Sequence, residues 1–126
     1  MKKSKSVEDY LETILIIRER DGYVRSIDVA NELGVSKPSV SVAMKKLREE
    51  KMISIDAAGN IKLLKAGRTI AENVYAKHLL LTNVLIAIGV DEDTAAEEAC
   101  LIEHAISDRT YELIDKFYKK NKKKNK

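Results

Sequence analysis

The 126-residue sequence predicts a mostly α-helical protein, with an N-terminal winged helix-turn-helix followed by a second helical region. Three observations predict this fold. One proline and five glycines interrupt few helical patterns, apolar residues recur at helical spacing along most of the chain, and one short stretch changes to strand-like alternation. A single cysteine excludes an internal disulfide framework and fits a reducing cytoplasm. No apolar run approaches the roughly 20 residues of a membrane span.

Three short helices are expected in the first half of the chain. Ser6, Ser26 and Ser36 are their expected N-caps, and their expected ranges are 6–21, 26–33 and 37–50. Pro38 falls in the first turn of the third helix, where a missing N–H does no harm. Residues 52–64 then alternate apolar and polar around the central residues 57–60, a pattern typical of a β-hairpin.

Longer helical patterns fill the second half. A long helix is expected over 68–88, a fifth helix over 91–106, and a sixth after a cap on Ser107. Charge divides the chain in the same places. Residues 1–68 have a net charge of +4, residues 69–118 have −7, and residues 119–126 contain six lysines. We therefore expect domains at 1–68 and 69–118, and a disordered lysine tail at 119–126.

Residues 26–50 have the arrangement of a helix-turn-helix: a helix, a tight turn at Gly34, and a second helix capped by Ser36. In this motif the N-terminal turn of the second helix enters the major groove of DNA. The hydroxyls and Lys37 suit base edges or phosphates, Val42 suits a thymine methyl, and the later cations suit phosphates. The candidate DNA-binding residues are Ser36, Lys37, Pro38, Ser39, Ser41, Val42, Lys45, Lys46, Arg48 and Lys62. A helical bundle with solvated lysines is the alternative interpretation.

A candidate metal site lies in the acidic half. Cys100, Glu103 and His104 are spaced i, i+3 and i+4, which places a thiolate, a carboxylate and an imidazole on one arc of a helix. Such donors suit a divalent transition metal but do not complete its coordination shell. Further candidate ligands are His78 in the long helix and Asp9 and Glu12 in the first helix. Each residue also has an ordinary interpretation, as a small core cysteine, a hydrogen-bonded histidine or a carboxylate at a helix N-terminus.

These motifs resemble the diphtheria-toxin-repressor-like metalloregulators, in particular their short two-domain manganese-transport-regulator type. The resemblance covers residues 5 to about 118 and rests on residues 7–12, 34–40, 69–78 and 98–107. Members are dimeric, cytoplasmic transcriptional repressors activated by Fe²⁺ or Mn²⁺, with a winged helix and a helical dimerisation and metal-binding domain. The resemblance implies a homodimer that binds operator DNA, controls metal-homeostasis genes, has no enzymatic activity and attaches to no membrane. It also implies that no SH3-like third domain is present.

Carried over by position, the resemblance implies six metal ligands: Asp9, Glu12, His78, Cys100, Glu103 and His104. Six ligands exceed one tetrahedral site, so we expect one or two metals per subunit. The manganese type has glutamate where this chain has Cys100, whereas the Cys-x-x-Glu-His run resembles the iron type. The thiolate favours Fe²⁺ and the carboxylates favour Mn²⁺, while Zn²⁺ or Co²⁺ is expected to bind in vitro. An ancillary iron-type site is not expected, because its positions hold Thr82 and Ala96.

The dimer surface is expected on the last two helices, whose apolar side chains exceed what two short helices bury internally. These are Ile102, Ile106, Leu113, Ile114 and Phe117. A closed monomer with these residues in its core is the alternative. Three functional alternatives stay open: a winged-helix regulator that senses a small organic ligand, a small metalloenzyme with Glu103 as general base, and a purely structural metal.

Overall fold

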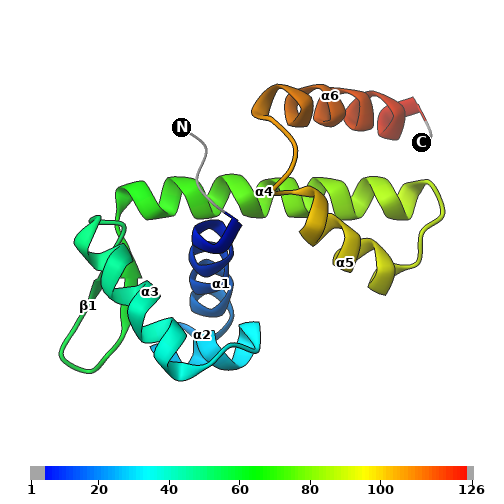
Figure 1. Ribbon diagram of the computed structural model, residues 1–126. Helices are drawn as coiled ribbons and strands as arrows, with labels where there is room; N and C mark the ends of the chain where they lie inside the picture. The colour runs from blue at the N-terminus through cyan, green and yellow to red at the C-terminus, as the bar shows by residue number, and fades with distance from the viewer. Residues whose placement is uncertain (1–4, 125–126) are drawn as a thin grey trace. The chain divides into compact units, whose positions relative to one another are not determined.

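The computed structural model describes residues 5–124, which form two compact units (Figure 1). The first extends to Asn73 and the second begins at Val74, so the boundary falls within the long helix α4 (Lys65–Ala87). Within the described range, every helix is too short or too polar to cross a membrane.

The first unit is a winged helix-turn-helix, as the sequence predicts. Its elements are α1 (Lys5–Asp21), α2 (Ser26–Leu33), α3 (Lys37–Glu49), β1 (Ile53–Ile55), β2 (Ile61–Leu63) and the start of α4. Helix α2 contacts α1 and α3, while β1 packs on α3 and β2 on α1. The largest fully buried side chains of this unit, which form its core, are Leu11, Ile14, Ile17, Val24, Val29, Val40, Met44, Ile53 and Ile61.

Of the three serines predicted to cap helices in this unit, one is an N-cap and two are not. Ser36 is the N-cap of α3, and its Oγ accepts a hydrogen bond from the Ser39 N–H at 3.2 Å. The N-cap of α2 is Arg25 instead of Ser26, because the Asp28 carboxylate accepts the Arg25 N–H at 2.9 Å. Helix α1 is already formed at Lys5, the first described residue, so Ser6 lies inside it.

The two strands form the wing. They pair antiparallel with Ile53 opposite Leu63 and Ile55 opposite Ile61. The turn between them is held by Asp56, whose Oδ1 accepts the N–H groups of Ala58 at 2.9 Å and Asn60 at 3.0 Å. After the wing, α4 begins at Lys65, three residues earlier than predicted.

The second unit contains the rest of α4, α5 (Glu92–Ile102) and α6 (Asp108–Lys124). Asp91 caps α5 by accepting the Thr94 N–H at 3.0 Å, and this hydrogen bond lowers the pKa of Asp91. Helix α5 ends four residues before the predicted end, and a turn fills residues 103–106. Ser107 caps α6 as expected, since its Oγ accepts the Thr110 N–H at 3.1 Å.

The lysine-rich end differs from the predicted disordered tail. Helix α6 continues to Lys124, through most of the segment 119–126, and the last two residues lie outside the described range. Lysine is a good helix former. In addition, Lys119 pairs with Asp115 at 2.9 Å, and the Asn121 amide donates to the Phe117 carbonyl at 2.8 Å. These local contacts extend the helix without a hydrophobic core around it.

Candidate metal centre and DNA-binding surface

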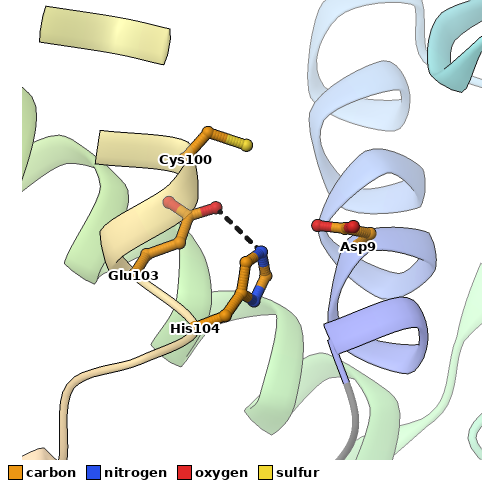
Figure 2. Close-up of side chains that lie close together, drawn as sticks. All are labelled: Asp9, Cys100, Glu103 and His104. Carbon is orange, nitrogen blue, oxygen red and sulfur yellow. Dashed lines mark ion pairs between the residues drawn. The ribbon is translucent and has the colours of Figure 1, made fainter. Parts of the chain in front are cut away.

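Four candidate metal ligands belong to the second unit. His78 lies on α4, Cys100 lies in the last turn of α5, and Glu103 and His104 directly follow that helix. Figure 2 draws the side chains of Cys100, Glu103 and His104 close together. Glu103 keeps helical backbone angles, φ −58° and ψ −27°, although the helix ends one residue earlier. The turn therefore continues in the helical direction, and the predicted i, i+3, i+4 grouping forms: donor atoms of Cys100, Glu103 and His104 lie within 4.8 Å of one another.

The Glu103 carboxylate lies between two imidazoles. Its Oε2 is 2.9 Å from Nδ1 of His78, and its Oε1 is 3.5 Å from Nε2 of His104. The Glu103 side chain has no solvent exposure. Oε1 accepts no hydrogen bond from any described residue. A buried carboxylate oxygen is costly unless a positive charge or a donor compensates it.

This donor set fits a divalent transition metal. It combines an anionic oxygen, two imidazole nitrogens and a thiol that is exposed to solvent. Imidazole and carboxylate together suit Mn, Fe, Co and Zn, while a thiolate shifts preference towards softer ions. Asp9 and Glu12 belong to the first unit, where they lie three positions apart on α1, with Glu12 buried and Asp9 half-buried. Their membership of the ligand set stays a prediction.

The candidate DNA-binding residues all lie on the outside of the first unit. The ten side chains predicted from the sequence, nine at the start and outer face of α3 and Lys62 on β2, are exposed. Val42 is 70% exposed, so its side chain is accessible to a partner on this face. The inner side of α3 is fixed by the buried residues Val40, Met44 and Leu47, so the two faces of the helix are cleanly separated.

A shallow hollow of about 240 Å³ lies beside the start of α3 and is lined by Ser26, Ile27, Lys37 and Ser41. Two of these residues, Ser26 and Ile27, were not among the predicted DNA contacts. Their signal in the sequence is weak, because Ser26 looks like a helix cap and Ile27 like a core residue. The structure exposes Ile27 by 39%.

An apolar groove of about 510 Å³ lies in the second unit between α4 and α6. Its lining residues are Leu81, Val84, Ala87, Ile88, Leu113, Ile114, Phe117, Tyr118 and Asn121. Leu113, Ile114 and Phe117 were predicted to lie on the dimer surface, whereas Ile102 and Ile106 are half-buried and do not line it. Phe117 is 71% exposed and Ile88 is 73% exposed, so the groove and its rim leave large apolar side chains in solvent.

Lys77 is a residue that the sequence analysis missed. Its side chain is only 7% exposed, and its ammonium lies 3.0 Å from the Asp108 carboxylate and 3.4 Å from the Ile106 carbonyl oxygen. It thereby ties α4 to the chain that follows Glu103 and His104, and to the start of α6. The signal in the sequence is a lone lysine beside His78 in a mostly apolar helix.

Comparison with known proteins agrees with this division of the chain. Residues 2–56 match the family description "Iron dependent repressor, N-terminal DNA binding domain", and residues 64–125 match "Iron dependent repressor, metal binding and dimerisation domain". An uncharacterised HTH-type transcriptional regulator of Methanocaldococcus jannaschii is 35% identical over 123 residues, which cover 96% of this chain and 98% of the relative.

A second curated protein and a solved structure also match over most of this chain. The HTH-type transcriptional regulator MntR of Geobacillus kaustophilus is 34% identical over 116 residues, or 89% of this chain and 82% of that protein. The solved structure of the manganese regulator SloR superposes with a TM-score of 0.78 at 35% identity. The match covers 94% of this chain and 55% of the SloR chain, so this chain spans about half the length of that structure.

Proposed function

Because this chain belongs to the iron-dependent repressor family, we propose that it represses metal-homeostasis genes by binding operator DNA as a homodimer when Fe²⁺ or Mn²⁺ is bound. The family matches confirm the resemblance that the motifs indicated. The metalloenzyme alternative is set aside because the family consists of transcriptional regulators. The observation that carries the metal part of the proposal is the Glu103 carboxylate, buried between the imidazoles of His78 and His104.

We assign the metal to six ligands, of which four lie in the second unit. The two remaining ligands, Asp9 and Glu12, are supported by the family match over residues 2–56 and by their spacing of three on α1. Three carboxylates, a thiol and two imidazoles exceed the four ligands of a tetrahedral site but would fill a single octahedral shell. We therefore propose one or two ions per subunit, with Glu103 as the ligand best placed to be shared. A bound ion would supply the positive charge that these acidic groups lack.

The positions of the ligands along the chain suggest how metal controls DNA binding. Asp9 and Glu12 are in the DNA-binding unit, and the other ligands are in the unit that matches a dimerisation domain. Without a counter-charge, the carboxylates of the two units repel each other, so the winged unit is held loosely. A bound metal would compensate that charge. The two α3 helices of a dimer, one from each subunit, are then held at a spacing that meets successive major grooves. Typical allosteric coupling of about 1–3 kcal/mol would change operator affinity about 5- to 150-fold.

The dimer proposal assigns the α4–α6 groove to the partner subunit. An apolar groove of about 510 Å³ beside exposed Phe117 also offers a site for a small organic ligand, which is the alternative function. One substitution distinguishes the dimer assignment from the organic-ligand assignment. Phe117→Glu places a charge on the exposed face, so we expect it to shift the dimer towards monomer in sedimentation. An organic-ligand regulator would keep its oligomeric state.

A single experiment tests the metal-dependent function. An operator duplex is first selected from random sequences with the Mn²⁺-loaded protein. Fluorescence anisotropy then measures the operator Kd under anaerobic conditions with Mn²⁺, with Fe²⁺ and with chelator. We expect tighter binding with either ion. An operator Kd that is the same with chelator and with metal, in a folded dimer, would overturn the proposal.

The thiol gives the matched variant for metal identity. Cys100→Glu restores the glutamate of the manganese type, and we expect it to raise the affinity for Mn²⁺ relative to Fe²⁺. Leu101→Glu, which places the same carboxylate at the exposed neighbouring position, is the control. If the affinities for Mn²⁺ and for Fe²⁺ are both unchanged in Cys100→Glu, the thiol is not a ligand and the site contains the remaining residues.

A further inference from the structure

Arg18 attaches α1 to the wing. Its Nη1 donates a hydrogen bond to the Ile61 carbonyl oxygen at 2.9 Å and lies 3.4 Å from Oδ1 of Asn60. Arg18 is half-buried, unlike the neighbouring Arg20, whose side chain is 56% exposed and pairs with Asp21 and Glu32. Two arginines of the same helix therefore have different environments, and only Arg18 of the two reaches the wing.

The loop after α1 strengthens this attachment. The Val24 N–H donates to Asn60 Oδ1 at 3.2 Å, and the Ile61 N–H donates to the Val24 carbonyl at 2.8 Å. Asn60 Oδ1 thus receives both the Arg18 guanidinium and a backbone amide. The start of β2 is fixed to the body of the unit through Arg18 and Val24.

Lys62 is the next residue on β2 and is exposed. It is the proposed phosphate contact of the wing. An isolated two-stranded hairpin is marginally stable in water, so its orientation depends on what holds its base. A lysine on a hairpin that moves freely spends little time at the position of one phosphate.

We propose that Arg18 is a positioning residue, which holds the wing so that Lys62 meets the DNA backbone. This inference rests on the proposed function, because it concerns DNA binding by the same unit. Helix α1 also carries Asp9 and Glu12, so a single helix connects two proposed metal ligands with the wing. Arg18 then acts through Lys62 and does not itself contact DNA.

A double-mutant cycle tests this proposal. The operator Kd is measured against salt concentration for the metal-loaded wild type, Arg18→Met, Lys62→Ala and the double variant. Each phosphate contact contributes about 0.9 to the slope of log K against log salt, so a dimer that loses one contact per subunit loses about 1.8. We expect a similar loss of slope and of affinity in both single variants. The double variant should be no weaker than either of them.

Additive effects would overturn the proposal. If Arg18 contacts a phosphate itself, the double variant loses about 3.6 in slope and its fold-changes multiply. An Arg18→Met protein with wild-type affinity and slope would overturn the proposal as well. Arg20→Met removes the same charge from the exposed side of α1 and is the matched control. In the Arg20→Met protein we expect Lys62→Ala to lower operator affinity and salt slope as much as it does in the wild type.

Three further measurements separate the result from effects on folding and from the proposed metal dependence. Asn60→Ala removes another part of the same attachment and should reproduce the Arg18→Met result, while thermal unfolding confirms that each variant is folded at the assay temperature. Wild-type binding with chelator tests the proposed function separately. If DNA binding proves independent of metal, the cycle performed on that binding still decides whether Arg18 acts through Lys62.

Discussion

The replacement Glu103→Gln keeps the shape of the side chain and removes its charge, so it tests the central residue of the proposed metal site. Glu103 is buried and faces both His78 at 2.9 Å and His104 at 3.5 Å. Glutamine can still accept a hydrogen bond from one imidazole, so the metal-free protein should remain folded. It cannot supply the anionic oxygen that a divalent cation needs in a buried site.

The expected loss can be worked out from linkage. At a free metal concentration 100 times Kd, binding to the native state stabilises the wild type by about 2.7 kcal/mol. Mutating an outer-shell partner of a ligand typically costs 10–100-fold in affinity, so the loss of a direct, buried ligand should cost about 100-fold or more. At the same metal concentration the variant would then gain about 0.4 kcal/mol. The difference of about 2.3 kcal/mol corresponds to about 7–12 °C in the metal-induced rise of Tm for a chain of this size.

Thermal unfolding followed by circular dichroism, with Mn²⁺ and with chelator, measures this rise for each variant and cancels changes in the metal-free Tm. Glu98→Gln makes the same chemical change at an exposed position of α5 and should retain the full rise. A Glu103→Gln protein whose Tm rises with Mn²⁺ as much as the wild type would refute the assignment of Glu103 as a ligand.

Three predictions concern stability. Gly67→Ala should lower the free energy of unfolding in urea by about 1 kcal/mol or more, because a Cβ there would overlap the Met52 carbonyl oxygen and overpacking outweighs the gain in helix propensity; higher stability would contradict this contact. Lys77→Ala should cost about 1–3 kcal/mol in the same assay, since it removes the bonds of a buried ammonium, whereas the exposed Lys116→Ala should change little. Asp91→Ala should destabilise at neutral pH. The Thr94 N–H lowers the pKa of Asp91 below its ordinary 3.8, so the cap stabilises above that value and is lost as pH falls through the folded pKa. The difference from wild type should therefore shrink in acid, and a pH-independent difference would argue against the charge.

The winged unit was predictable because its signals are local. Ser36 and Gly34 mark the ends of two helices by their own chemistry, and the alternation over 52–64 has the period of a strand. The predictions from sequence fail where a hydrogen bond to another residue, near or distant in the chain, determines the local structure. Arg25 replaces Ser26 as a cap because the Asp28 carboxylate takes its N–H, and no serine signal reveals that. The wing's attachment to Arg18 joins residues 43 positions apart, which periodicity does not encode.

In the second unit, composition and spacing alone do not predict every structural feature. A run of lysines predicts disorder when it is considered alone, but Asp115 and Phe117 lie one turn earlier and bond to Lys119 and Asn121. The ligand spacing of Cys100, Glu103 and His104 was predictable because a helix fixes it. The position of His78 against Glu103 was not, since it depends on how α4 packs beside the end of α5. Lys77 was missed for the same reason.

Glu103 is buried whereas Cys100 is exposed, so we expect the two residues to affect metal binding in different ways. Glu103 has no exposure and touches both imidazoles, so it contributes to the site whatever ion is present. The Cys100 side chain is exposed at the edge of the same group, where its replacement changes one donor without disturbing the buried carboxylate. Substitution of Glu103 should therefore weaken Fe²⁺ and Mn²⁺ together, whereas substitution of Cys100 should change their ratio. If both substitutions lowered both affinities by the same factor, the thiol would be an essential ligand, and the preference between the two ions would have to arise from Asp9 and Glu12.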